Sequence, residues 1–160
     1  MSKIAFVSNR EDDNSLFSKK DDYRWKAISK AVEEIISRDE WRGHTFLIPI
    51  YTRFDRLILQ LAERYGNPVE FYFPEEDWGQ RFLPTNDIQR IERMRRYYPA
   101  YVVNGTMERL ERMCADSDGV VILRSKANLG GIEKAVMNKR CMVVPIQEAI
   151  AQYQEMMTTV

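Results

Sequence analysis

The clearest strand–turn–helix unit of the chain reads GVVILRSKANLGGIEKAVMN, over residues 119–138. Its first part, from Gly119 to Leu123, is a continuous apolar run, which is typical of a strand that is covered on both faces. Polar residues follow, and Gly130 and Gly131 then open a short helix that is predicted over residues 132–138. A strand that leads through a glycine turn into a helix is the repeating unit of parallel α/β proteins.

The rest of the chain repeats this alternation. Apolar runs predict further strands over residues 4–7, 45–50, 69–73 and 141–145. Apolar residues at helical spacing predict helices over residues 23–38, 54–65 and 147–157, and Gly66–Pro68 is a stop signal after the second of these. The sequence therefore predicts a Rossmann-like α/β fold, with an open, mainly parallel five-stranded sheet and helices on both faces. One domain is expected over residues 1–160.

The composition narrows the function classes. The 160 residues include 24 Lys plus Arg and 24 Asp plus Glu, so a generally cationic nucleic-acid binder is not expected. Cys114 and Cys141 lie in apolar contexts, which predicts buried thiols rather than a disulfide framework. The single histidine, His44, argues against a zinc site or a histidine-based triad, so no metal is predicted. No apolar run reaches the ~18 residues of a membrane span and no signal peptide is evident, so a cytoplasmic protein is expected.

Polar side chains follow the predicted strands, where parallel α/β proteins bind their ligands. Glycines at a helix start let backbone N–H groups approach a phosphate. Alternatively, Gly130 and Gly131 only form a tight turn. Asp55 is either a ligand contact or a carboxylate that caps a helix, and Asn104 is a helix N-cap first and a ligand contact second. The candidate ligand-binding residues are Ser8, Asn9, Arg10, Thr52, Arg53, Asp55, Asn104, Arg124, Ser125, Gly130 and Gly131.

Short motifs stand at the predicted strand ends and helix starts, namely Val7–Arg10, Arg53–Leu57, Asn67–Val69 with Glu76–Trp78, Val103–Met107, and Val120–Leu123 followed by Gly130 and Gly131. In their order, over most of the chain to about Pro145, they resemble the SLOG superfamily. This Rossmann-like group includes the lysine-decarboxylase-like LOG proteins and the YspA/YpsA-like branch, to which the motifs are most similar. The resemblance implies a nucleotide or nucleotide derivative as the ligand and a binding or sensing function. No cofactor is predicted.

Related enzymes give an alternative function. LOG proteins cleave the N-glycosidic bond of nucleoside monophosphates with a glutamate after the glycine-rich motif. Glu133 matches that position, so the resemblance implies it as the tentative catalytic residue. A second resemblance, to nucleoside 2-deoxyribosyltransferase-like proteins, rests on Asp116–Asp118, Val120–Leu123 and Glu133. The chain also departs from the SLOG pattern, since Ser8 replaces a glycine. A glutamate in a first turn also complements the helix dipole, so binding or sensing is the leading interpretation.

Residues 90–101 mix arginines with tyrosines and give a third hypothesis, a protein-interaction module. Basic and aromatic side chains together also suit single-stranded nucleic acid, and residues 97–101 suit self-association into a homo-oligomer. The simpler interpretation, which the zero net charge favours, is an amphipathic helix with Ile88, Ile91 and Met94 packed inward and the arginines in solvent. The next helical stripe is predicted to be core and comprises Met107, Leu110, Met113 and Cys114.

Overall fold

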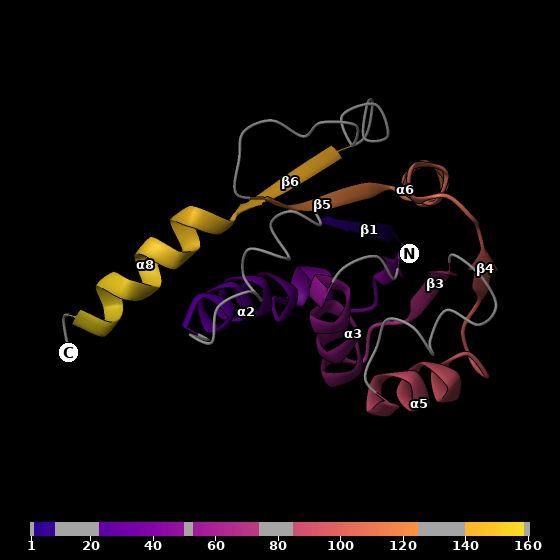
Figure 1. The fold of residues 1–160 in the computed structure, drawn as a ribbon, viewed down its shortest axis with the longest axis horizontal. Coiled ribbons are helices and arrows are strands. Elements are labelled where there is room, and N and C mark those ends of the chain that lie inside the picture. The colour runs from indigo at the N-terminus through magenta and orange to yellow at the C-terminus, as the bar shows by residue number, and fades with distance from the viewer. Residues whose placement is uncertain (1, 9–22, 50–52, 74–84, 125–139, 159–160) are drawn as a thin grey trace.

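A computed structural model describes residues 2–8, 23–49, 53–73, 85–124 and 140–158. Within these residues the chain forms a six-stranded, all-parallel open sheet, five α-helices and one 3₁₀ helix (Figure 1). The strand order is β4-β3-β2-β1-β5-β6. The strands are β1 (Lys3–Ser8), β2 (Thr45–Ile48), β3 (Val69–Phe73), β4 (Ala100–Val102), β5 (Gly119–Arg124) and β6 (Arg140–Pro145). The helices are α2 (Tyr23–Ile36), η1 (Asp39–Trp41), α3 (Arg53–Tyr65), α5 (Thr85–Met94), α6 (Thr106–Asp116) and α8 (Ile146–Thr158).

The predicted fold class is confirmed, but the described part of the sheet has one strand more than the five expected. The additional strand is β4, which spans only three residues and pairs with β3 from Phe71–Ala100 to Phe73–Val102. Three residues are too few to show a two-residue period, and Val102 at the end of this edge strand is exposed. The run Ala100–Val103 is apolar, but its first residues were included in the arginine- and tyrosine-rich segment, and no strand was predicted there. The helix predicted over residues 132–138 lies outside the described residues.

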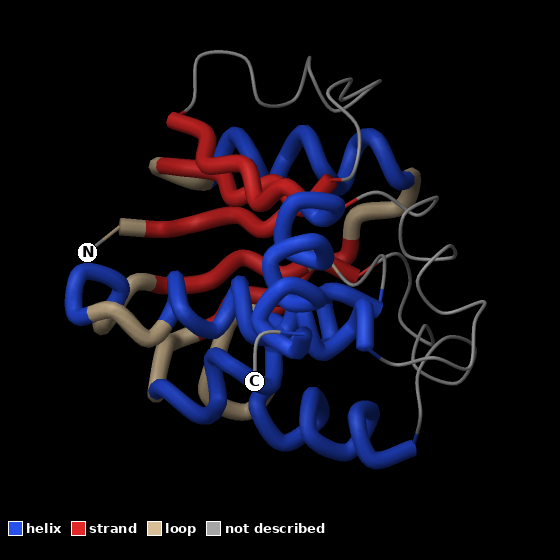
Figure 2. The backbone as a smooth tube through the Cα atoms, turned by 90° about the vertical axis from the view of Figure 1, so that its left-hand side faces the viewer, coloured by secondary structure: helices blue, strands red, loops and turns tan. Residues whose placement is uncertain are grey.

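The buried apolar side chains of the described residues form one cluster on each face of the sheet. The larger cluster includes Phe6, Phe46 and Phe71 and packs under α2, α3, α5 and α8. The smaller cluster includes Val7 and Tyr72 and packs under α6. Figure 2 shows the strands between helices on both sides, as predicted. Right-handed crossovers explain the division, because the chain steps from β1 to β4 in one direction and returns to β5 in the other.

One of the two cysteines that were predicted to be buried is exposed. Neither forms a disulfide, and Cys114 is buried on the inner side of α6 as expected. Cys141 is exposed, so the prediction of a buried thiol is wrong for this residue. It lies on β6, the last strand of the sheet in the described residues, which pairs there with β5. The apolar sequence around Cys141 reflects the buried side of β6, where Val144 joins the larger cluster.

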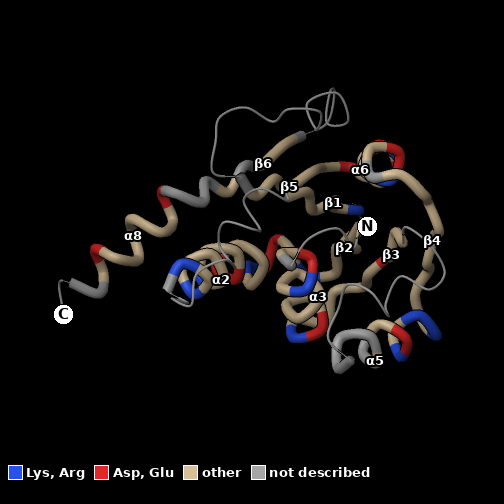
Figure 3. The backbone as a smooth tube through the Cα atoms, in the orientation of Figure 1, with Lys and Arg blue, Asp and Glu red and all other residues tan. Residues whose placement is uncertain are grey.

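The described part of the arginine- and tyrosine-rich segment behaves as an amphipathic helix. Ile91 and Met94 are buried, which confirms the inward face of α5. Arg93 and Arg95 form ion pairs of 3.3 Å with glutamates, and Tyr97 is 79% exposed. Acidic and basic residues also lie side by side on α2, α3 and α6 (Figure 3). The interaction hypotheses for this segment stay predictions. In the described ranges, no helix is long and apolar enough to cross a membrane.

The predicted stop signal after α3 is confirmed in detail. Gly66 adopts a positive φ of 71°, and the Asn67 N–H donates to the Ala62 carbonyl at 2.9 Å, as in a Schellman motif. The buried Asn67 side chain then donates through Nδ2 to the carbonyls of Trp41, at 2.8 Å, and His44, at 3.1 Å. The end of α3 is therefore joined to the turn that precedes β2.

Gly66→Ala is expected to lower the free energy of unfolding by ~1–2 kcal/mol, which is the cost of a left-handed conformation for an L-residue. No atom lies within 4 Å of the added Cβ, so the whole loss comes from the backbone. Gly66→Asn should lose less, because asparagine tolerates this conformation. Urea unfolding measures both variants, and an alanine variant as stable as the wild type would contradict the assignment.

Candidate functional site

The strand order places a topological switch at β1. The chain passes from β1 to β2, β3 and β4 on one side, whereas β5 pairs with β1 on the other side. The helices α2 and α3 cover one face, and α6 covers the other. The connections therefore diverge beyond the carboxyl ends of β1 and β5, where open α/β sheets bind ligands. We call the edge formed by the carboxyl ends of the strands the carboxyl edge, and this edge is the candidate site.

The ends of β1 and β5 meet at the carboxyl edge. Ser8 is the last residue of β1, is 2% exposed and stands beside Leu123 in the parallel register. Arg124 follows directly and ends β5. Neighbouring strands are ~4.8 Å apart, so the backbones of Ser8 and Arg124 are brought together as predicted from their strand ends. The side chain of Arg124 lies outside the described residues.

The amino terminus of α3 lies at the same edge, after β2. Arg53 begins the helix, and Asp55 lies in its first turn. The Asp55 side chain is only 3% exposed, and its neighbour Phe54 is buried against Trp25 with ring centroids 5.6 Å apart. Because α3 contacts both β1 and β2, Asp55 lies close to the switch point. A carboxylate there is favoured by the helix dipole, and its oxygens are hydrogen-bond acceptors.

Asn104 does not cap α6, so that prediction is wrong. The N-cap residue is Gly105, which has a φ of 88°, and its carbonyl accepts from the Arg109 N–H at 3.0 Å. Asn104 is exposed and follows β4 at the sheet edge, three strands from β1. Three interstrand spacings amount to ~14 Å, so the fold places Asn104 apart from Ser8. Its contact with a ligand stays a prediction.

Most of the remaining site predictions fall outside the described residues. The side chain of Arg53 is among them, although its backbone begins α3. The other residues are Asn9, Arg10, Thr52, Ser125, Gly130, Gly131 and the tentative catalytic Glu133.

A buried arginine at the carboxyl edge was missed by the sequence analysis. Arg109 lies in the first turn of α6, is 4% exposed and donates through Nη1 to the Val103 carbonyl at 3.3 Å. A guanidinium keeps its charge in proteins and has five N–H donors. Arg109 therefore fixes a positive charge on the α6 face of this edge, opposite the face with Asp55. The sequence did contain one signal of this burial. Arg109 lies one turn before Met113, which was predicted to be core, and hence on the inner side of the same helix.

A second polar cluster lies at the opposite end of the sheet. It comprises Lys3, Glu70, Tyr72, Tyr101 and Asp116, and we call it the phenol–carboxylate cluster. Tyr72 Oη donates to Asp116 Oδ2 at 2.7 Å, and Tyr101 Oη donates to Glu70 Oε1 at 3.0 Å. Lys3 Nζ lies 2.8 Å from Glu70 Oε2. The cluster joins β1, β3 and β4 to the last residue of α6.

The environment of the cluster favours the protonated forms of its phenols and amine. Burial, followed by the hydrogen bond to Asp116, raises the pKa of Tyr72 above that of an ordinary phenol. The hydrogen bond to the Glu70 carboxylate raises the pKa of Tyr101. The same carboxylate raises the pKa of Lys3.

These raised pKa values predict that the fold loses stability in alkali. Above about pH 10 the phenols of the unfolded chain lose their protons, whereas Tyr72 and Tyr101 keep theirs in the folded state. The unfolded state then binds fewer protons, so the free energy of unfolding falls as the pH rises from there toward the folded-state pKa values. Urea unfolding across this range should show a shallower fall in Tyr72→Phe than in wild type. Identical slopes would contradict the prediction.

No three His, Cys, Asp or Glu side chains gather as metal ligands among the residues that the structure describes.

No protein-family model matches the chain. The chain is 30% identical over 126 residues to the (S)-ureidoglycine–glyoxylate transaminase of Bacillus subtilis (strain 168), an alignment that covers 68% of this chain. The chain therefore spans only 30% of the length of that enzyme. The match shows distant homology over a segment and assigns no family.

Proposed function

We propose that this protein binds a nucleotide or nucleotide derivative at the carboxyl edge beside β1 and β5, as a binding or sensing module. One observation carries the proposal most directly. Two buried ionisable residues of opposite charge, Asp55 and Arg109, lie at this edge on the two faces of the sheet, at 3% and 4% exposure. Burying a charge is costly unless it is paired and hydrogen-bonded, so such positions are favoured where polar groups have a role.

The chemistry of a nucleotide matches both residues. A guanidinium donates to phosphate oxygens in a charge-assisted, often bidentate arrangement. A carboxylate accepts hydrogen bonds from ribose hydroxyls. Ser8, which is buried at the end of β1, adds a hydroxyl donor and acceptor. The resemblance of the strand-end motifs to the SLOG superfamily favours the same ligand class. The transaminase activity is not proposed, because the chain spans only 30% of that enzyme.

A melting screen with AMP, ADP, cyclic AMP, NAD, ADP-ribose and phosphate-free adenosine tests the proposal. A ligand at 100 times its Kd should stabilise the fold by ~2.7 kcal/mol. Asp55→Asn should weaken the response to ribose-containing ligands, and Arg96→Gln, which changes an exposed arginine of the α5–β4 turn, should leave it unchanged.

Three outcomes separate the hypotheses. No stabilisation by any phosphate-bearing compound would refute the proposed function. Release of free adenine from AMP would instead favour the N-glycosidic enzyme. Binding that depends on Arg96 and not on Asp55 would favour the interaction hypothesis for residues 90–101.

A further inference from the structure

We propose that Tyr72 is a positioning residue for the phosphate end of the site, acting through α6 on Arg109. The inference rests on the proposed function, because it concerns how that site is held. Tyr72 lies on β3, is completely buried, and belongs to the phenol–carboxylate cluster at the opposite end of the sheet from the ligand. Its effect on the site would therefore be transmitted along the helix.

The packing between α6 and the sheet explains why a polar contact matters here. Leu110, Met113 and Cys114 cover the smaller core cluster with apolar side chains. Apolar packing has no preferred direction, so on its own it fixes the position of a helix along its axis only loosely. The bond from Tyr72 Oη to Asp116 Oδ2, at 2.7 Å, joins the last residue of α6 to a strand. A short bond to a carboxylate is directional and strong, so it fixes the axial position of the helix.

Arg109 lies on the same helix face as Asp116. The two residues are seven positions apart, which is close to two full turns and ~10 Å of helix. An axial shift of α6 at Asp116 is therefore carried to Arg109 with little loss. Farther along the chain, the Lys3 N–H donates to Asp118 Oδ2 at 2.8 Å and holds the connection to β5. Within the phenol–carboxylate cluster, Tyr72 is thus the strand residue whose phenol donates directly to α6.

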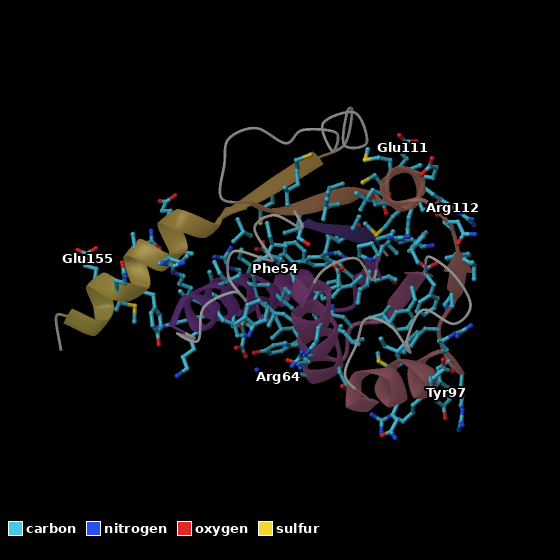
Figure 4. The ribbon with its side chains drawn as sticks, in the orientation of Figure 1. Phe54, Arg64, Tyr97, Glu111, Arg112 and Glu155 are labelled. Carbon is cyan, nitrogen blue, oxygen red and sulfur yellow. The ribbon has the colours of Figure 1, made fainter. Side chains whose placement is uncertain are left out.

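Tyr101 offers a matched control within the same cluster. Its ring is 5.1 Å from that of Tyr72, and its phenol also donates to a carboxylate, that of Glu70 on β3. Glu70 does not belong to α6. The Arg112 guanidinium lies over the Tyr101 ring at 4.9 Å, on the side of α6 toward β4 (Figure 4). Tyr101→Phe keeps this ring contact and removes only the bond to β3.

The experiment compares Tyr72→Phe and Tyr101→Phe in the full chain, by titration calorimetry with AMP and with adenosine. Tyr72→Phe should weaken AMP binding about fivefold, the scale of one net hydrogen bond, and leave adenosine binding within about twofold. Tyr101→Phe should leave both affinities unchanged. A merely structural role for Tyr72 would not change the ratio of the two affinities. An unchanged ratio in Tyr72→Phe, or an equal change in both variants, would overturn the inference.

Amide hydrogen exchange without ligand separates this inference from the proposed function. Tyr72→Phe should speed the exchange of the Arg109 and Leu110 amides more than Tyr101→Phe does, since only the first substitution releases α6. Equal exchange in the two variants would overturn the positioning role of Tyr72. A wild-type protein that binds neither AMP nor adenosine would refute the proposed function, whereas the exchange result would still decide how α6 is held.

Discussion

Phe46→Ala is expected to lower the free energy of unfolding by ~3–5 kcal/mol, the usual cost of truncating a buried phenylalanine. The side chain is completely buried on β2, in the larger core cluster. Its ring packs edge-on against Phe6, with centroids 4.8 Å apart, and against Trp41 at 6.4 Å. The substitution therefore opens a cavity between the sheet and the helices above it. Since a domain of this kind is stabilised by only ~5–15 kcal/mol, urea unfolding should show a large shift of the midpoint.

Two further substitutions serve as controls for Phe46→Ala. Tyr97→Ala removes an aromatic side chain that is 79% exposed and should change the free energy of unfolding by no more than ~0.5 kcal/mol. Phe46→Leu keeps an apolar side chain and should cost less than Phe46→Ala. Comparable losses for Phe46→Ala and Tyr97→Ala would contradict the placement of the core.

The sequence predicted those parts of the fold whose information is local. The strands β1, β2, β3 and β5 appear as apolar runs because both of their faces are buried. Gly66 marks the end of α3 because its backbone adopts a positive φ. β4 was missed because its formation depends on β3. Its Tyr101 side chain reaches Glu70, 31 residues away, and no pattern within residues 100–102 reveals that partner.

Only those site residues that are marked by local sequence were predicted. Ser8 and Arg124 follow apolar runs directly, and Asp55 lies in the first turn of the helix after the second run, so their approach to one edge follows from the parallel α/β arrangement alone. Arg109 was hidden within a stripe that was predicted to be core, and that prediction is correct for Leu110, Met113 and Cys114. Its place at the carboxyl edge depends on α6 crossing back over the sheet from β4 to β5. That crossover is a property of the strand order and not of any local motif.

Asp55 and Arg109 give the two faces of the sheet opposite charges at the carboxyl edge. Asp55 lies on the face of α2 and α3, and Arg109 lies on the face of α6. Both lie in first turns, where the helix dipole is positive, so the dipole reinforces Arg109 and is offset at Asp55. An anionic group is therefore favoured on the α6 face, and a hydroxyl-bearing group is favoured on the α3 face. A ligand bound across this edge would have one orientation.

Arg109→Gln is expected to weaken AMP binding by ~1.5–3 kcal/mol, or about 10- to 150-fold, which is the range for hydrogen bonds to charged groups. Adenosine lacks the phosphate and should bind the variant as it binds the wild type, so it serves as an internal control for folding of the site. Arg109→Lys should recover part of the AMP affinity, because its ammonium keeps the charge and loses the bidentate geometry.

Arg96→Gln is the matched control, since it removes an exposed arginine of the turn between α5 and β4 and should leave both affinities unchanged. Titration calorimetry with AMP and with adenosine measures the wild type and the three variants, each with a native circular dichroism spectrum. If Arg109→Gln weakened AMP and adenosine equally, Arg109 would support the fold of the site and would not contact the phosphate. A selective loss of AMP binding, in contrast, would place the phosphate on the α6 face.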